Sequence, residues 1–325
     1  MSAIDVLPLL TERMHEVLRI QAARSEGSVP ADSGPAAQRV AYAAEREYWN
    51  DGGPTMAVTT DELVEGPQGP VRVRWFHPGG EARSVIVYVH GGGFVVGDLD
   101  THDRIMRTLA AESGAVVVGV DYALSPEAKF PRAVHECAAV ARHVAEHASD
   151  HGVAGGRVSF AGDSGGANLA VGATLLLRDQ GGPEIESLLL YYGIYGLRDS
   201  RSRRRLGNEW DGLTQADLEF YLGSYVRGPQ DLTDPYLDCL GADLDGFPPT
   251  YLLGSTVDPL IDDTLALADA LSDHGVPHRL RSVGGVLHGF LHYSRVLPEA
   301  VEALAEGAAF HRSVVAARLT TPADR

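Results

Sequence analysis

Short apolar runs alternate with amphipathic stretches along most of the chain. The runs are rich in β-branched and aromatic residues and predict strands; they lie at 84–89, 115–122, 157–162, 187–193, 250–254 and 278–283. The stretches between them carry apolar residues at helical spacing and predict helices at 101–112, 131–148, 165–179, 260–274 and 298–317. This alternation is typical of the α/β fold class, in which a mostly parallel sheet has helices on both faces.

The chain before this alternation has another pattern. Residues 4–24 have apolar positions at helical spacing, and we expect the helix to begin near Pro8, because proline is tolerated only in the first turn. Residues 26–37 are rich in Gly, Ser, Pro and Ala, which predicts a flexible joint. Two runs at 56–64 and 69–78 predict a hairpin ahead of the main sheet.

The pattern also breaks between residues 193 and 249, where we predict one helix at 214–226. This stretch is too long for an ordinary connection and is a candidate lid or cap. Its aromatic residues Trp210, Phe220 and Tyr225 are interpreted mainly as packing in its core.

Composition and charge narrow the class of protein. The chain has 325 residues, 44% of them hydrophobic, which is enough for a substantial core. Its formal net charge of −17 would repel phosphate backbones and anionic lipid, so we expect neither a nucleic-acid partner nor a membrane partner. The basic run RSRRR at 201–205 is interpreted as a solvated loop in preference to an anion site.

Cysteine content and the N-terminal sequence bear on location. Cys137 and Cys239 have no CxxC or Cys/His spacing, which predicts reduced thiols and no metal site. The first 20 residues lack a basic stretch followed by an apolar core, and no apolar run approaches the length of a membrane span. We therefore expect a cytoplasmic protein.

The segment GDSGG connects the strand at 157–162 to the helix at 165–179. It has the spacing G-x-S-x-G of a nucleophile elbow, in which Ser164 occupies a sharp turn and side chains at 162 and 166 would collide with neighbouring elements. The N–H groups at the start of the helix face the place where negative charge develops. We therefore predict that Ser164 is a nucleophile and does not lie in a plain glycine-rich turn.

Three consecutive glycines follow His90 at the end of the strand 84–89. If Ser164 attacks an acyl carbonyl, the oxygen becomes an anion that needs several preorganised donors, and the residue after the nucleophile supplies only one N–H. Glycines allow further backbone N–H groups to approach that oxygen. A phosphate loop is less favoured, since G-x-G-x-x-G is missing. His90 is interpreted as a structural hydrogen-bonding residue.

A base is expected late in the chain, because a nucleophile elbow is followed by its acid and then its histidine. His288 fits this order, in a glycine-rich loop after the strand 278–283, and His292 is its nearest competitor. The acid should follow the strand 250–254. There the candidates are Asp258, Asp262 and Asp263, and Asp258 is preferred because the other two begin the next helix, where acidic residues stabilise the amino end.

Five motifs occur in the order and spacing of one known family: HGGGFVVGD, DYALSPEAKFPRA, GDSGGANLA, DPLIDD and HGF. On these motifs residues 70–315 resemble the hormone-sensitive-lipase-like family of α/β-hydrolases. Within this family the chain is most similar to the bacterial acetyl esterases, in the general residue pattern of the segments YGIYGLRDS and LHGFLHYSR.

The resemblance implies an α/β-hydrolase catalytic domain at 51–325 and a helical cap built from residues 1–50 and part of 193–230. It implies a catalytic triad of Ser164, Asp258 and His288, oxyanion-hole amides from Gly92, Gly93 and Gly165, and supporting roles for His90, Gly91 and Asp163. The expected activity is that of a serine carboxylesterase for short-chain acyl esters, above all acetyl esters, acting through an acyl-enzyme without a cofactor.

Two alternatives stay open. The same triad would serve a deacetylase acting on an amide or ester of a specialised metabolite. A non-catalytic ligand-binding protein on this fold is disfavoured, because all three triad residues are present. The expected partner is a small acyl ester, and a homodimer is left open.

Overall fold

The structure, a computed structural model, describes residues 3–24, 34–154 and 156–320. At its centre is an eight-stranded sheet in the order β1-β2-β4-β3-β5-β6-β7-β8. The strands are β1 (Val58–Gly66), β2 (Gly69–His77), β3 (Val85–Val89), β4 (Val116–Asp121), β5 (Val158–Asp163), β6 (Ile185–Tyr191), β7 (Thr250–Ser255) and β8 (His278–Val283). β1 and β2 form the predicted hairpin, and all pairings from β4 to β8 are parallel, which confirms the predicted fold class.

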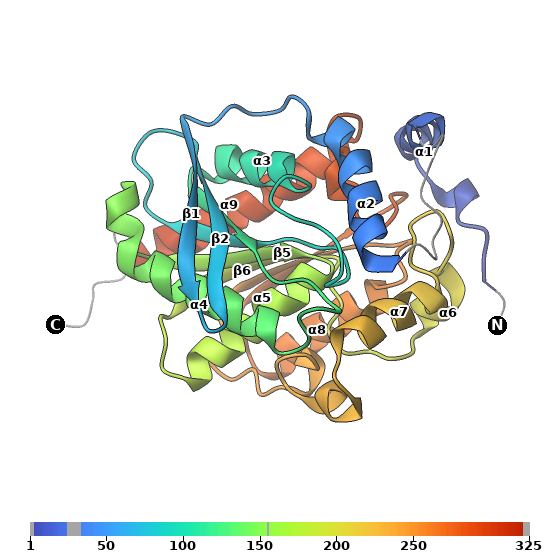
Figure 1. Cartoon of the computed structure of the whole chain (residues 1–325). Coiled ribbons are helices and arrows are strands. Elements are labelled where there is room, and N and C mark those ends of the chain that lie inside the picture. Colours follow the sequence, from blue (N-terminus) through green and yellow to red (C-terminus); the bar gives the residue numbers. More distant parts are fainter. Residues whose placement is uncertain (1–2, 25–33, 155, 321–325) are drawn as a thin grey trace.

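Helices cover both faces of this sheet (Figure 1). They are α1 (Glu12–Arg24), α2 (Gly34–Asn50), α3 (Asp103–Ser113), α4 (Arg132–His147), α5 (Gly165–Asp179), α6 (Arg201–Leu206), α7 (Gln215–Tyr225), α8 (Ile261–Asp273) and α9 (Pro298–Thr320). Among the described helices none is both long and apolar enough to cross a membrane.

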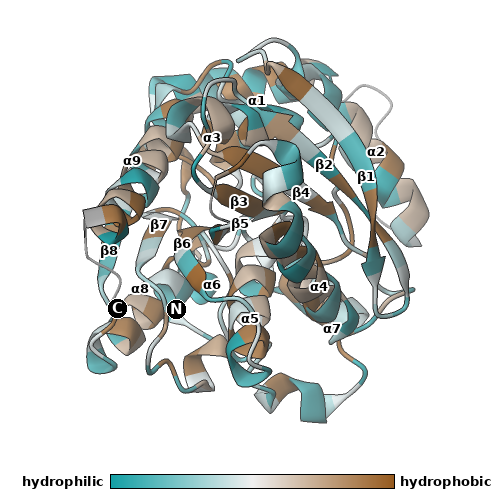
Figure 2. Cartoon of the chain, turned by 90° about the vertical axis from the view of Figure 1, so that its left-hand side faces the viewer, coloured by the Kyte–Doolittle hydropathy of each residue, from teal (hydrophilic) through white to brown (hydrophobic). Residues whose placement is uncertain are grey.

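The two faces of β3 show why its run is continuously apolar. Val85, Val87 and Val89 pack in one core with α4 and α5, whereas Ile86 and Tyr88 pack in a second core with α3 and α9. In Figure 2 the apolar strands β3 and β5 lie in the interior, between these helices. A strand buried on both faces has no polar side, so it reads as a run and not as an alternation.

The N-terminal segment differs from its prediction. Instead of one helix from Pro8, a short 3₁₀ turn spans Leu7–Leu9 and α1 begins at Glu12. Residues 34–37 of the predicted joint belong to α2, which the sequence analysis did not predict, and residues 26–33 lie outside the described residues. Pro35 is in the first turn of α2, where a missing N–H costs nothing.

The prediction of a solvated loop at 201–205 is wrong. These residues form α6, and the Arg203 side chain is 5% exposed, with its Nη2 2.9 Å from Oδ2 of the fully buried Asp263. A buried carboxylate needs a counter-charge and hydrogen bonds, and the N–H groups of Tyr195, Gly196 and Leu197 supply further donors to Asp263. The arginine run therefore has a structural role that its charge pattern alone did not indicate.

Because β3, β5, β7 and β8 are parallel, the loops that follow them emerge at the same edge of the sheet. Ligands of such sheets bind beyond this edge. Helices α1, α2, α6 and α7 gather on the same side of the molecule (Figure 1). Segments far apart in the sequence thus meet above the strand ends.

Candidate active site

Ser164 lies in a strained turn between β5 and α5. Its φ of 53° and ψ of −122° are unusual for a residue other than glycine. A Cβ at Gly162 would lie 2.6 Å from the carbonyl oxygen of Gly166, and one at Gly166 would lie 2.1 Å from that of Val89. Only glycine fits at both positions, so the steric reason inferred for G-x-S-x-G holds in three dimensions.

The structure brings Ser164, His288 and Asp258 together from three separate loops. His288 Nε2 is 2.9 Å from Ser164 Oγ, and His288 Nδ1 is 2.7 Å from Asp258 Oδ2. Asp258 is fully buried, and its Oδ1 accepts the N–H of Leu260 at 2.7 Å. The arrangement can pass a proton from a serine hydroxyl to an imidazole whose orientation is set by a carboxylate.

The electrostatics of His288 suit a base. Burial acts to lower its pKa, but the charge of Asp258 and the hydrogen bond to it, with smaller effects of Asp211 and Asp163, outweigh burial and raise the pKa above 6.5. Of the alternatives to Asp258, Asp263 is occupied by Arg203 and Asp262 accepts the N–H of Ser202. His292 contacts the hydroxyl of Tyr42 at 3.2 Å, and the contact with Ser164 is made by His288.

Gly92 and Gly93 line the same cavity as Ser164 and Gly165. Gly92 has a φ of 116°, and a Cβ on it would lie 2.2 Å from the carbonyl oxygen of Val96. Its own carbonyl accepts the N–H groups of Val95 and Val96, which holds the loop in a tight turn. The loop therefore places backbone without side chains at the wall of the cavity that Ser164 also lines.

Gly92 and Gly165, which both line the cavity, should respond differently to alanine. Gly92→Ala is expected to lower kcat by about 10²- to 10³-fold, because the loop must move and displace the amides that the sequence analysis predicts as oxyanion donors. In Gly165→Ala the new Cβ would meet its nearest neighbours at 3.4 Å, an ordinary contact, and the N–H is retained. We expect its kcat to stay within about tenfold of the parent. Equal losses in steady-state assays of the two variants would contradict this steric reading.

His90, Gly91 and Asp163 lie at the base of the glycine loop and are joined by hydrogen bonds. Asp163 Oδ1 accepts the Gly91 N–H at 2.9 Å and the Tyr88 hydroxyl at 2.8 Å. Burial acts to raise the pKa of Asp163, but His102 and these hydrogen bonds more than offset it and lower the pKa. His90 stacks on Tyr122, and burial lowers its pKa to about 4, so it is neutral and serves as packing and a hydrogen-bonding group.

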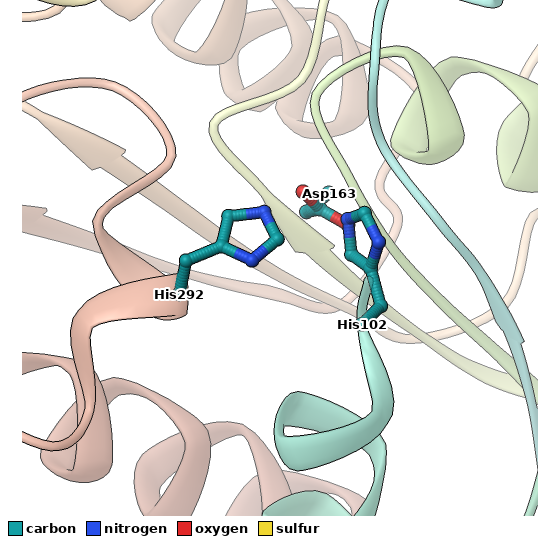
Figure 3. Close-up of side chains that lie close together, drawn as sticks. All are labelled: His102, Asp163 and His292. Atoms are coloured by element: carbon teal, nitrogen blue, oxygen red, sulfur yellow. The ribbon is translucent and has the colours of Figure 1, made fainter. Parts of the chain in front are cut away.

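A buried polar cluster extends from Asp163 to His102 and His292 (Figure 3). His102 Nε2 is 3.5 Å from Asp163 Oδ1, and the two imidazole rings are 4.5 Å apart. These three groups have the ligand types and spacing to hold a metal ion. Tyr88, Gly91 and Tyr42 already contact Asp163 and His292, however, so hydrogen bonding gives the cluster a role in bracing the elbow.

The cavity above Ser164 has a volume of about 260 Å³ and is lined from several segments. Met14 and Gln21 come from α1, and Tyr42 and Arg46 from α2. Residues 210–213 and α7 close the other side. The N-terminal helices and the 193–230 region therefore both cover the candidate site.

The aromatic residues of the 193–230 region are not all buried in a core, contrary to the prediction for most of them. Tyr225 is buried and stacks on Phe94, as expected for a core residue. Trp210 is 46% exposed and lines the cavity, and Phe220 is 41% exposed, so the core interpretation is wrong for these two.

Sequence reasoning missed several cavity residues, among them Tyr42, Arg46, Asp211 and Tyr221. The Ala-, Glu- and Arg-rich composition of residues 36–47 could have predicted α2. No local pattern points to Asp211, which is one acidic residue in an irregular stretch.

A family model described as alpha/beta hydrolase fold matches residues 86–292. An esterase of Pyrobaculum calidifontis is 32% identical with a TM-score of 0.85, and the match covers 94% of this chain and 99% of that one. An α/β-hydrolase enzyme from the metagenome of Lake Arreo is 30% identical, with a TM-score of 0.88 and coverage of 95% and 99%. A thermostable carboxylesterase cloned from a metagenomic library is 31% identical, with a TM-score of 0.84 and coverage of 88% and 99%. These likenesses extend well beyond the residues that the family model matches.

Proposed function

Because this chain belongs to the hormone-sensitive-lipase-like family of α/β-hydrolases, we propose that it is a serine carboxylesterase for short-chain acyl esters. The observation that carries the proposal is the hydrogen-bonded chain from Ser164 through His288 to Asp258 at the wall of one cavity. The names of the similar structures, esterase and carboxylesterase, support the same reaction type.

In the first half of the proposed reaction, Ser164 Oγ bonds to the acyl carbon while its proton passes to His288 Nε2. The carbonyl oxygen becomes an anion and receives hydrogen bonds from the N–H groups of Gly92, Gly93 and Gly165. Collapse of this intermediate breaks the bond between the acyl carbon and the alcohol oxygen. The alcohol oxygen takes the proton from His288, and Ser164 remains acylated.

In the second half, water adds to the acyl carbon and gives a proton to His288. Collapse then returns that proton to Ser164 Oγ and releases the carboxylic acid. Asp258 holds Nδ1–H throughout and stabilises the imidazolium without taking the proton. Besides the ester and water, these steps use only side chains and backbone N–H groups of this chain.

The size of the cavity supports a preference for short acyl chains. Its volume of about 260 Å³ is at the small end for ligand pockets. The ring of Tyr221 from α7 lies against the glycine loop, since a Cβ on Gly93 would be 2.4 Å from Tyr221 Cδ1. We assign residues 1–50 and part of 193–230 as the cap that sets this limit. A cytoplasmic location stays a prediction, to which the buried free thiols of Cys137 and Cys239 are relevant.

Hydrolysis of p-nitrophenyl esters of increasing chain length tests this function. We expect kcat/KM to be highest between acetyl and butyryl and to fall by about tenfold or more at octanoyl, because overfilling a packed site costs about 1–3 kcal/mol. A rate that rises steadily to dodecanoyl would contradict the short-chain proposal. Faster cleavage of p-nitroacetanilide than of p-nitrophenyl acetate would favour the amide deacetylase instead.

A further inference from the structure

Asp211 is the one acidic residue of the 210–213 loop, and it lines the cavity that contains Ser164 and His288. Its Oδ1 accepts the N–H of Leu213 at 3.2 Å. Its Oδ2 is buried, and among the described residues it has no hydrogen-bond partner. Leaving a carboxyl oxygen buried and unpaired is costly, so a donor or a cation from a ligand would complete this site.

The environment of Asp211 favours positive charge. Burial raises its pKa to about 7, and the charge of Asp258 adds to the increase while His288 opposes it. A cation beside the carboxyl would stabilise the ionised form and reverse this shift. Arg46 of α2, which also lines the cavity, already has Glu45 as counter-ion, at 2.6 Å. The net charge of −17 also attracts cations to the protein.

Aromatic side chains accompany the carboxyl. Trp210 and Tyr221 line the same cavity, and Trp210 is 46% exposed; among the described residues its ring makes no aromatic or cation–π contact, whereas Tyr221 contacts the ring of Phe220. A carboxylate and aromatic rings that line one cavity can together bind an organic ammonium group, the first by charge and the rings by cation–π contact. Tyr221 also packs against an apolar cluster of Leu213, Leu218 and Leu260, so the cavity combines the carboxyl of Asp211 with both aromatic and aliphatic surface.

The position of Asp211 relates it to the alcohol half of an ester. Asp211 and His288 line the same cavity, and the charge of each affects the pKa of the other. His288 Nε2 delivers its proton to the departing alcohol, so the alcohol of a bound ester lies next to His288 in the cavity that Asp211 also lines. We propose that this enzyme prefers acyl esters whose alcohol carries an organic ammonium group, with Asp211 as the specificity-determining residue. This inference rests on the proposed ester hydrolysis.

Two acetate esters of equal shape test the inference. Acetylcholine and 3,3-dimethylbutyl acetate differ in a quaternary nitrogen in place of a quaternary carbon. At pH 8 we expect the parent protein to favour acetylcholine in kcat/KM by about tenfold or more, mainly through KM. Asp211→Asn should bring this ratio to about one. Glu209→Gln removes the same charge from an exposed side chain two residues before Asp211 and should leave the ratio unchanged.

The pH dependence of the ratio provides a readout that a structural role would not move. Both esters require neutral His288, so its titration cancels in the ratio. The ratio should rise with pH through about 7 as Asp211 ionises, and Asp211→Asn should make it flat. The other titratable groups at the cavity, whose effects the variant leaves in place, are Tyr42, Arg46, Asp163, Tyr221, His288, His292 and Tyr293, with Asp258 behind His288.

The outcomes separate the two proposals. If neither ester is hydrolysed, nor any p-nitrophenyl ester, the proposed function fails. If both esters are hydrolysed with a ratio near one in the parent protein, ester hydrolysis stands and the ammonium preference is wrong. A ratio that persists in Asp211→Asn, or that disappears equally in Glu209→Gln, would remove Asp211 from the role.

Discussion

Replacing Ser164 by alanine is expected to lower kcat/KM for p-nitrophenyl acetate by about 10⁵- to 10⁶-fold. The variant cannot form the acyl-enzyme, and His288 loses the hydroxyl whose Oγ lies 2.9 Å from its Nε2. A small activity above the uncatalysed rate should remain, because the backbone donors around the cavity are unchanged. Steady-state hydrolysis with a burst measurement on the parent protein checks both points.

The same variant should keep its fold. The N–H of Ser164 donates to the carbonyl of Tyr191, and this backbone contact does not depend on the side chain. Alanine tolerates the positive φ of this turn about as well as serine does. We therefore expect a thermal midpoint within a few degrees of the parent. Full activity in a folded Ser164→Ala protein would mean that the chemistry takes place elsewhere.

Replacing Asp258 by asparagine should lower kcat by about 10⁴-fold. Asparagine removes the charge that stabilises the imidazolium and allows the ring to adopt the wrong tautomer for accepting the proton of Ser164. The side chain is fully buried and close in shape to the original, so the fold should persist. The loss should fall on kcat far more than on KM, because Asp258 does not line the cavity.

The pH profile offers a second readout for this variant. Activity requires neutral His288, so in the parent protein it rises with pH through the pKa of His288, which Asp258 raises above 6.5. With asparagine that pKa falls, and the rise in the remaining activity should move to lower pH. Asp262→Asn is the matched control, since Asp262 is half-buried and binds the N–H of Ser202. Equal effects of the two substitutions would argue against Asp258 as the acid.

Much of the fold followed from patterns that are local in the sequence. The apolar runs predicted β3 to β7 to within a few residues, because strands buried on both faces tolerate few polar residues. The bounds of β8 were predicted as well, although most of its side chains are exposed. The need for glycine on both sides of Ser164 could be predicted from the sequence, because the sharp turn at this residue imposes it. Strand order along the chain placed Asp258 and His288 on loops at one edge, where the structure then brought them into contact.

Other features depended on partners distant in the sequence. The charge pattern predicts that Arg203 belongs to a solvated run. In the structure it is buried against Asp263, which lies sixty residues later in the chain. The first turn of α2 resembles a joint, since its Gly and Pro are common in linkers. Contacts with distant residues position the helix, among them the packing of Trp49 against Tyr293 and the hydrogen bonds of Arg39 to Val95 and Ser125. Both cases reflect contacts that a residue's own neighbours do not encode.

By itself the sequence determined the alternation of strands and helices, the sharp turn at Ser164 and the order of the groups expected to act on it. These features depend on backbone sterics and on the burial of short segments, and both are local properties. The tertiary structure alone decided which residues surround the cavity. Asp211 and Tyr221 come from the 193–230 region and Arg46 from α2, and they meet only because these segments fold over the same edge of the sheet. Burial of Asp211 beside Asp258 and His288 then produces its unusual charge state, which arises from distances in space and not from position along the chain.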